Sequence, residues 1–152
     1  MYPKHVTVVI TGLMVLMVAV LPALTLRYTV HNTKVAYFEA LIQCVKKGGH
    51  LVVVDTPYQQ AQVWQAIKRA GPTTESWWTS GTDLGMEGSW VWLSRNSRVG
   101  SVRGWTNWMD SEPNNGTNGT ENCLALIGGT KAGQWSDVVC ESLRFYVCEY
   151  DQ

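Results

Sequence analysis

The 152-residue sequence carries little charge and no excess of either sign. Twelve basic and twelve acidic side chains give a formal net charge of zero, and charged residues make up 16% of the chain. Without a basic excess the chain lacks the attraction on which nonspecific phosphate binding depends, so nucleic acid is not expected as a partner. The low charge, combined with 45% hydrophobic residues, also argues against intrinsic disorder, and the length predicts a single domain.

The motifs of several protein classes are missing. His5, His31 and His50 lie far apart in the sequence, without the spacing of a zinc site. The segment Gly128-Gly129-Thr130-Lys131 lacks the spacing of a nucleotide-binding phosphate loop and is predicted to be a turn. No internal repeat, coiled-coil heptad or collagen-like segment is visible, so the sequence is compatible with an oligomer but predicts no oligomeric state.

Phenylalanine is scarce, with two residues against eight tryptophans, and residues 93–122 contain hardly any aliphatic side chains. Such a long stretch is either disordered or held by something other than a core. Four cysteines and fourteen glycines favour a compact, loop-rich domain held by two disulfides. Four cysteines allow three pairings, which the sequence alone leaves open.

The N-terminus has the pattern of a secretory signal. Lys4 precedes an uncharged run, residues 6–26, that is long enough to span a bilayer. A helix-breaking proline and small side chains near its end favour cleavage, so we predict a signal peptide over residues 1–23 and a folded domain over residues 24–152. An uncleaved membrane anchor is the alternative. Both topologies place the domain outside the cytosol, where disulfides persist, and the preferred one makes the protein secreted and extracellular.

The first half of the domain is predicted to alternate strands and helices. Residues 27–30 and the apolar run 51–54 are typical of strands. A helix between them is predicted to end before Gly48, because apolar residues recur at helical spacing at Val35, Phe38, Leu41, Ile42 and Val45. Thr56, followed by proline, is a helix N-cap, and this second helix is predicted to end near Ala70.

The second half is predicted to contain only strands and loops. Short apolar pieces alternate with stretches rich in Gly, Asn, Ser and Thr; the pieces include Trp77-Trp78, Trp90 to Trp92, Leu124 to Ile127, Trp135 and Phe145 to Cys148. The tryptophans are interpreted mainly as core residues rather than sugar platforms. Trp105 and Trp108 are expected to anchor the long loop.

Oxygen-bearing side chains gather near two cysteines in this half. They are three carboxylates and three neutral groups: Glu112, Asn114, Glu121, Asn122, Ser136 and Asp137. Hard oxygen ligands in a secreted protein indicate calcium, which takes six to eight of them. The alternative is that these are ordinary solvated loop residues.

Several ordered motifs resemble the C-type lectin-like domain. The later ones are Trp105 before Glu112-Pro113-Asn114, Glu121-Asn122-Cys123, Trp135-Ser136-Asp137 before Cys140, and Cys148-Glu149. The earlier ones are Tyr37-Phe38-Glu39-Ala40 before Cys44, Gly49-His50-Leu51, and Trp78 to Gly88. The resemblance covers residues 27–150. Within the family, the sequence resembles secreted arthropod lectins. It implies an α+β fold in which two helices pack on small antiparallel sheets, with a long calcium-binding loop region.

This resemblance implies a principal calcium site. Its ligands would be Glu112, Asn114, Glu121, Ser136 and Asp137, and the first four would also contact sugar. The sequence departs from the family at Ser136, where sugar-binding members usually carry Asn. Serine is shorter and lacks an amide donor, so we expect a weakened site rather than a lost one. Pro113 is expected to be cis, as the family has it.

The order of residues in Glu-Pro-Asn implies mannose, glucose, N-acetylglucosamine or fucose rather than galactose. The resemblance also implies an auxiliary calcium site, formed by Asp83, Glu87, Asn115 and Asn122. Two of these are amides where the family has acids, so we expect its affinity to be low. The alternative is a turn with two solvated acids.

The resemblance pairs Cys44 with Cys148 and Cys123 with Cys140. Independently of it, Asn115-Gly116-Thr117 and Asn118-Gly119-Thr120 are N-glycosylation acceptors. Glycans at Asn115 or Asn118 would lie beside the implied sugar site.

Taken together, these patterns predict a secreted calcium-dependent lectin for mannose-type glycans, a recognition molecule for microbial or host cell surfaces in innate immunity. The first alternative is a domain of the same fold that has lost sugar binding and engages a protein partner. A glycosidase using two of the clustered carboxylates is the second. No nucleophile with an adjacent base is visible, so the chain is not expected to be an enzyme.

Overall fold

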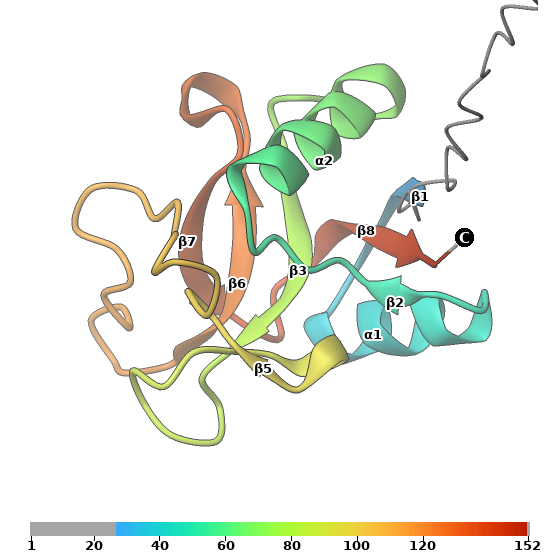
Figure 1. Cartoon of the computed structure of the whole chain (residues 1–152). Helices are drawn as coiled ribbons and strands as arrows, with labels where there is room; N and C mark the ends of the chain where they lie inside the picture. Colours follow the sequence, from blue (N-terminus) through green and yellow to red (C-terminus); the bar gives the residue numbers. More distant parts are fainter. Residues whose placement is uncertain (1–26, 152) are drawn as a thin grey trace, which may run out of the picture.

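The computed structural model describes residues 27–151 (Figure 1). Its strands are β1 (Arg27–Val35), β2 (His50–Leu51), β3 (Ser76–Thr82), β4 (Val91–Trp92), β5 (Ser97–Arg98), β6 (Glu121–Ile127), β7 (Gln134–Val139) and β8 (Arg144–Tyr150). Its helices are α1 (Tyr37–Lys46) and α2 (Pro57–Ala70), with 3-10 turns η1 (Leu93–Arg95) and η2 (Gly129–Lys131). The predicted signal peptide or anchor, residues 1–23, lies outside the described residues. Between residues 27 and 151, neither helix has the length and apolar character to cross a membrane.

The strands form one hydrogen-bonded network, with the main order β1-β8-β3-β4-β5. Strand β2 pairs with Cys148 and Glu149 of β8, and β6 lies between β3 and β7. Every pair is antiparallel except β3 with β8, which is parallel at Trp77 and Trp78. The predicted α+β fold, with two helices and antiparallel sheets, is confirmed, and this one pair adds a parallel contact. The two strands lie far apart in the sequence, and no local pattern specifies how they meet.

Helix α1 ends before Gly48 as its sequence predicts, but Val35, the first residue of the predicted pattern, belongs to β1, and the helix presents a different face to the core. The side chains packed inward are Tyr37, Ala40 and Cys44, all 0% exposed. Phe38, Ile42 and Val45, which belong to the apolar pattern that predicted the helix, are 53%, 49% and 63% exposed. Their spacing therefore indicated the helix correctly without identifying its buried face.

Helix α2 confirms its predicted N-cap and end. The Thr56 hydroxyl accepts a hydrogen bond from the Gln59 amide at 3.1 Å, which satisfies one of the free amides of the first turn. The helix ends at Ala70, where Gly71 leads the chain toward β3. Val63 and Ile67 are fully buried and pack in a core cluster with the inner tryptophans.

The long segment after β5 is held by tryptophans, as predicted. Trp135 on β7 is 0% exposed and makes edge-to-face contacts with Trp92, Trp105 and Trp108, at centroid distances of 5.6, 5.2 and 5.5 Å. Trp108 also contacts Trp90 at 4.9 Å. In Figure 1 this segment, drawn in yellow to orange, extends to the left of β7. These ring contacts attach the segment after β5 to the core, although the segment has few aliphatic side chains of its own.

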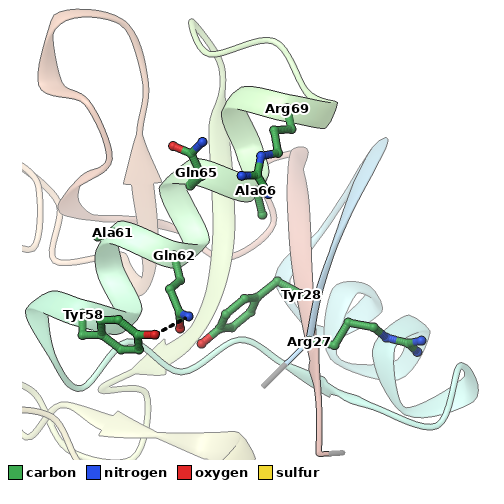
Figure 2. Close-up of a pocket in the computed structure, with 8 residues that line it drawn as sticks. All are labelled: Arg27, Tyr28, Tyr58, Ala61, Gln62, Gln65, Ala66 and Arg69. Atoms are coloured by element: carbon green, nitrogen blue, oxygen red, sulfur yellow. Dashed lines mark hydrogen bonds between the residues drawn. The ribbon is translucent and has the colours of Figure 1, made fainter. Parts of the chain in front are cut away.

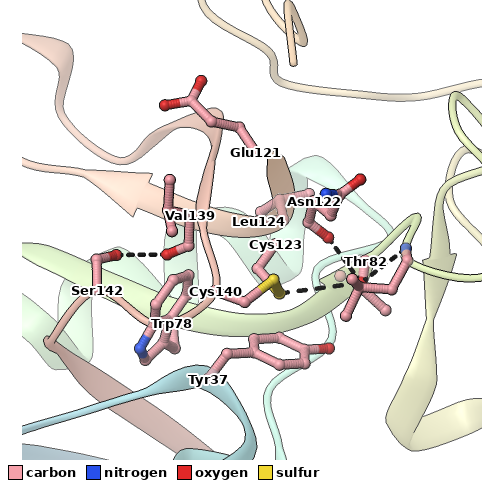
Figure 3. The surroundings of a disulfide bond; sticks show 12 residues. Tyr37, Trp78, Thr82, Glu121, Asn122, Cys123, Leu124, Val139, Cys140 and Ser142 are labelled. Carbon is pink, nitrogen blue, oxygen red and sulfur yellow. Dashed lines mark hydrogen bonds between the residues drawn. A yellow bond between two sulfur atoms is a disulfide. The ribbon is translucent and has the colours of Figure 1, made fainter. Parts of the chain in front are cut away.

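Both predicted disulfides are present, joining Cys44 to Cys148 and Cys123 to Cys140. The first ties α1 to β8, and the second ties β6 to the end of β7. Figure 3 shows the second bridge among Trp78, Tyr37 and Thr82, with the Thr82 hydroxyl donating to the Asn122 carbonyl at 2.7 Å. The bridges belong to a buried cluster beneath the loop that bears the candidate site.

Candidate functional site

The Glu-Pro-Asn motif is fixed to β7 by one buried carboxylate. The Glu112–Pro113 peptide bond is cis, as expected. Asp137 is 1% exposed, and its Oδ1 accepts a hydrogen bond from the Asn114 amide at 3.2 Å. Its Oδ2 accepts from the Asn115 amide at 2.5 Å. Asp137 therefore holds two successive backbone amides of the loop, which positions the side chains of the motif.

Glu112 lies in a crowded acidic environment. Its Oε1 accepts from Asn114 Nδ2 at 2.9 Å, whereas its Oε2 is buried without a hydrogen-bond partner. Burial, followed by the neighbouring Asp137 and Glu121 carboxylates, raises the pKa of Glu112 to about 7, against a smaller opposing effect of Ser136. Clustered carboxylates that disfavour one another's ionisation are stabilised by a cation.

Glu121 stands at the start of β6 and is enclosed by the same loop. Its amide donates to Asn115 Oδ1 at 3.1 Å. Gly116 has φ +60°, and a Cβ atom at this position would lie 2.9 Å from the Glu121 carboxyl carbon. Only glycine therefore fits comfortably here. In Figure 3 the Glu121 side chain points away from the disulfide.

Ser136 precedes Asp137 on β7 and is 8% exposed. Its hydroxyl donates to the Asp137 carbonyl at 3.0 Å. The hydroxyl proton is therefore used within the strand, and the hydroxyl oxygen keeps its lone pairs for a ligand.

The residues predicted for the principal site are gathered at one end of β6 and β7, and their donors are all oxygen atoms. Within residues 27–151, no group of three or more His, Cys, Asp or Glu side chains is arranged to hold a metal ion by itself. The predicted set includes the neutral residues Asn114 and Ser136. An all-oxygen set with a buried, unpartnered Glu112 oxygen fits the chemistry of calcium.

The residues predicted for the auxiliary site are partly assembled. Asn115 Nδ2 donates to Glu87 Oε2 at 2.6 Å. Asp83 is 2% exposed; its Oδ2 accepts from the Gly88 amide at 2.8 Å, and its Oδ1 is buried without a partner. Burial and then the charge of Asp137 are the two effects that raise the Asp83 pKa, against the Gly88 hydrogen bond that lowers it. Asn122 contacts Asp83 through its backbone, because its carbonyl accepts a hydrogen bond from the Asp83 amide at 3.2 Å.

Asn115 connects the two predicted sites, a role that sequence reasoning missed. Its amide binds Asp137, its side-chain oxygen accepts from the Glu121 amide, and its side-chain nitrogen binds Glu87. Its φ of +59° places it in the left-handed region that Asn tolerates better than most residues. Asn followed by Gly was the available signal for such a turn.

A buried ion pair outside the predicted sites was also missed. Glu149 on β8 is 2% exposed, and its Oε1 lies 2.7 Å from Arg95 Nη2. Its Oε2 accepts from the Val53 amide at 3.1 Å. The pair joins η1 to β8 and the buried run after β2, so its role is structural.

The family model described as "Lectin C-type domain" matches residues 33–150. Salivary C-type lectin 1 of Aedes albopictus is 30% identical over 129 residues, 81% of each chain. The low affinity immunoglobulin epsilon Fc receptor of Mus musculus is 35% identical over 114 residues, 74% of this chain and 30% of the receptor.

Among solved structures, the carbohydrate-recognition domain of cow CD23, determined in the presence of a GlcNAc2Man3 oligosaccharide, superposes with a TM-score of 0.70. It is 27% identical and covers 84% of this chain and 88% of that one. The vertebrate relatives by sequence are longer proteins, and the chain spans between 30% and 54% of their length.

Proposed function

The chain belongs to the C-type lectin domain family, and on that premise we propose that it is a secreted, calcium-dependent lectin for mannose-type glycans. C-type lectin domains are carbohydrate-binding proteins rather than enzymes, in agreement with the sequence-based expectation. The proposal extends to recognition of microbial or host cell-surface glycans, as in innate immunity, and it draws on the salivary lectin and CD23 as similar proteins.

One observation carries this proposal. Asp137 holds the amides of Asn114 and Asn115, and this arrangement leaves a buried Glu112 oxygen without a partner beside the Asn114 side chain. Glu112, Asn114, Glu121, Ser136 and Asp137 would hold calcium. The ion, when bound, supplies coordination positions for two neighbouring sugar hydroxyls.

The chain's own residues would select the sugar. A Glu112 oxygen accepts a hydroxyl proton, and the Asn114 amide nitrogen donates to the adjacent hydroxyl oxygen. The acceptor therefore precedes the donor along the loop. Exchanging the carboxylate of Glu112 with the amide of Asn114 reverses the order of acceptor and donor that the sugar hydroxyls must match. Such an exchange therefore tests the sugar specificity of the motif.

The test uses the secreted protein on mannose and galactose resins, first with calcium and then with a chelator. We expect retention on mannose alone and release by the chelator. The double variant Glu112→Gln, Asn114→Asp should lose mannose and gain galactose. The double variant keeps the net charge, and the control is Asp110→Asn, which changes an exposed position of the same loop outside the motif. Mannose retention that survives the chelator would refute the calcium-dependent proposal.

A second candidate function is binding of a protein partner through the same fold. Ser136 in place of Asn favours it, and the mouse relative is named as a receptor for immunoglobulin Fc, a protein ligand. Absence of retention on both resins, in a correctly folded sample, would favour this alternative.

A further inference from the structure

A groove of about 570 Å³ lies between β1 and α2, away from the residues assigned to calcium (Figure 2). Tyr28 lines it from β1, and Tyr58, Gln62, Gln65 and Arg69 line it from α2. The volume falls within the range of roughly 300–1,000 Å³ that is usual for small-ligand sites. The sequence predicted no site from this set of side chains, because they come from two segments and share no motif.

Tyr28 and Tyr58 extend toward each other from β1 and α2 and border this groove (Figure 2). The Tyr28 hydroxyl is buried without a hydrogen-bond partner, so it presents no free surface to a ligand, and Tyr28 offers the groove its ring. Burial, with a smaller effect of the nearby Glu149, raises the pKa of Tyr28 to about 12, so the phenol is neutral. The hydroxyl that can reach a ligand is that of Tyr58, which is 70% exposed.

The remaining polar groups of the groove add further donors. Gln62 Nε2 donates to the Tyr58 hydroxyl at 3.0 Å, which leaves the Tyr58 proton free to donate. Arg69 adds a guanidinium with five N–H groups and no acceptor. Arg27 also borders the groove, but its guanidinium lies over the Tyr150 ring at 4.8 Å and contributes charge rather than contact.

The lining contains no Asp or Glu. Hydrogen-bond donors and positive charge therefore predominate, and the ligand that complements them carries acceptors and negative charge. The rings of Tyr28 and Tyr58 offer apolar faces of the kind that pack against the C–H face of a sugar ring, while the Tyr58 hydroxyl stays available for hydrogen bonds.

We propose that this groove is a second, calcium-independent carbohydrate site, which binds an acidic saccharide through Arg69, Tyr28 and Tyr58. The sugar ring would lie against the tyrosines, its carboxylate or sulfate would accept from Arg69, and a hydroxyl or ring oxygen would accept from Tyr58. This site goes beyond the calcium-dependent function and involves none of its residues.

The experiment measures binding of oligosaccharides to the secreted protein by titration calorimetry, in chelator throughout. The probes are an unsulfated uronic-acid oligomer, a sulfated oligomer and a neutral oligomer of the same length. We expect the acidic probes to bind and the neutral probe to fail. Comparison of the two acidic probes identifies whether carboxylate or sulfate is the preferred acid. Because no calcium is present, failure of the principal site does not affect this result.

Variants test the residues directly. Arg69→Gln should weaken binding about tenfold or more, the effect of losing one charge-assisted hydrogen bond. Tyr58→Phe should weaken it several-fold while keeping the ring. The matched control is Lys68→Gln, which removes the same charge from an exposed neighbour on α2 outside the groove.

Several outcomes would overturn the proposal. They are absence of binding to all three probes, equal binding of the neutral probe, inorganic sulfate binding as tightly as the sulfated oligomer, and equal weakening by Lys68→Gln and Arg69→Gln. Thermal melting of each variant establishes that it is folded before its affinity is compared.

Discussion

The backbone amide of Asn115 donates to Asp137 Oδ2 at 2.5 Å, next to the Asn114 amide on Oδ1 of the same carboxylate. One buried side chain of β7 thus fixes the turn that follows the cis Glu112–Pro113 bond. Asp137 has this structural role whether or not it also binds an ion. Loss of sugar binding on its mutation must therefore be separated from loss of loop structure.

Asp137→Asn should destabilise the protein by about 1–3 kcal/mol, because the new amide group faces one of the two backbone N–H groups that the carboxylate now satisfies. Urea unfolding, followed by tryptophan fluorescence without calcium, measures this effect. The control is Asp110→Asn at an exposed position, which should be nearly neutral. Equal stability of the two variants would show that the two hydrogen bonds to Asp137 contribute nothing.

Ser136→Asn should strengthen calcium and mannose binding several-fold, because it adds a carbonyl ligand and a separate amide donor. Ser136→Ala, which removes the oxygen, should weaken both. Calcium titration followed by mannose titration measures the two affinities. Ser136 is buried, so a melting curve should accompany each variant. If both substitutions leave the affinities unchanged, position 136 has no part in the site.

Local patterns predicted most of the fold. Neighbouring residues determine the N-cap at Thr56 and the end of α1 before its glycines. The tryptophan contacts follow from the need to bury large apolar side chains. The disulfide pairing needed the family resemblance, because three pairings are equally consistent with the composition. The parallel contact of β3 with β8 was not predictable, since it depends on strands that lie far apart in the sequence.

The candidate site was likewise predictable only in part. The family resemblance carried by Glu-Pro-Asn predicted the cis bond correctly, and the same resemblance supplies the proposed ligand set. The bonds from Asn115 to Glu87, Asp137 and Glu121 were not predictable, because they require a left-handed residue whose side chain and backbone reach three elements at once. The groove between β1 and α2 is likewise a product of tertiary packing.

Substitutions on the exposed stripe of α1 should leave stability nearly unchanged. Ile42→Gln and Val45→Gln are expected to shift the free energy of unfolding by no more than about 0.5 kcal/mol, since both side chains are about half exposed or more. Ala40→Ile, on the buried face, should cost about 1–3 kcal/mol by overpacking. Chemical denaturation of the three variants measures the difference. A large loss for the Gln variants would mean that another surface covers this stripe.

Glycosylation of the folded, secreted protein is expected at Asn118 and not at Asn115. Asn118 is exposed. In Asn115, by contrast, the side-chain Nδ2 donates to Glu87 and the side-chain Oδ1 accepts from the Glu121 backbone amide. A glycan on Asn115 Nδ2 would crowd the Glu87 contact. Mass spectrometry of the glycopeptide should show a glycan that disappears in Thr120→Val and persists in Thr117→Val. The reverse pattern would contradict the prediction.

His31 should contribute a loss of stability as the pH decreases below about 6.5. This ring stacks on Tyr146 at 4.6 Å and shares a 2.9 Å hydrogen bond with Thr29. Burial, and then the charge of Lys47, lowers the His31 pKa below its ordinary value of 6.5. The unfolded chain therefore takes up the proton at a higher pH than the folded chain. Protonation favours unfolding in the window between the lowered value and 6.5, and stability is regained as the pH rises through it.

Urea unfolding at about pH 7.5 and about pH 5.5, on either side of the ordinary histidine value, measures this dependence. Other groups also titrate in this range, so the informative quantity is the change relative to a variant. The wild type should lose more stability between the two conditions than His31→Gln does, whereas His50→Gln, which retains His31, should follow the wild type. If His31→Gln loses as much stability as the wild type, the imidazole is not the titrating group, and the stacking on Tyr146 has no consequence for pH dependence.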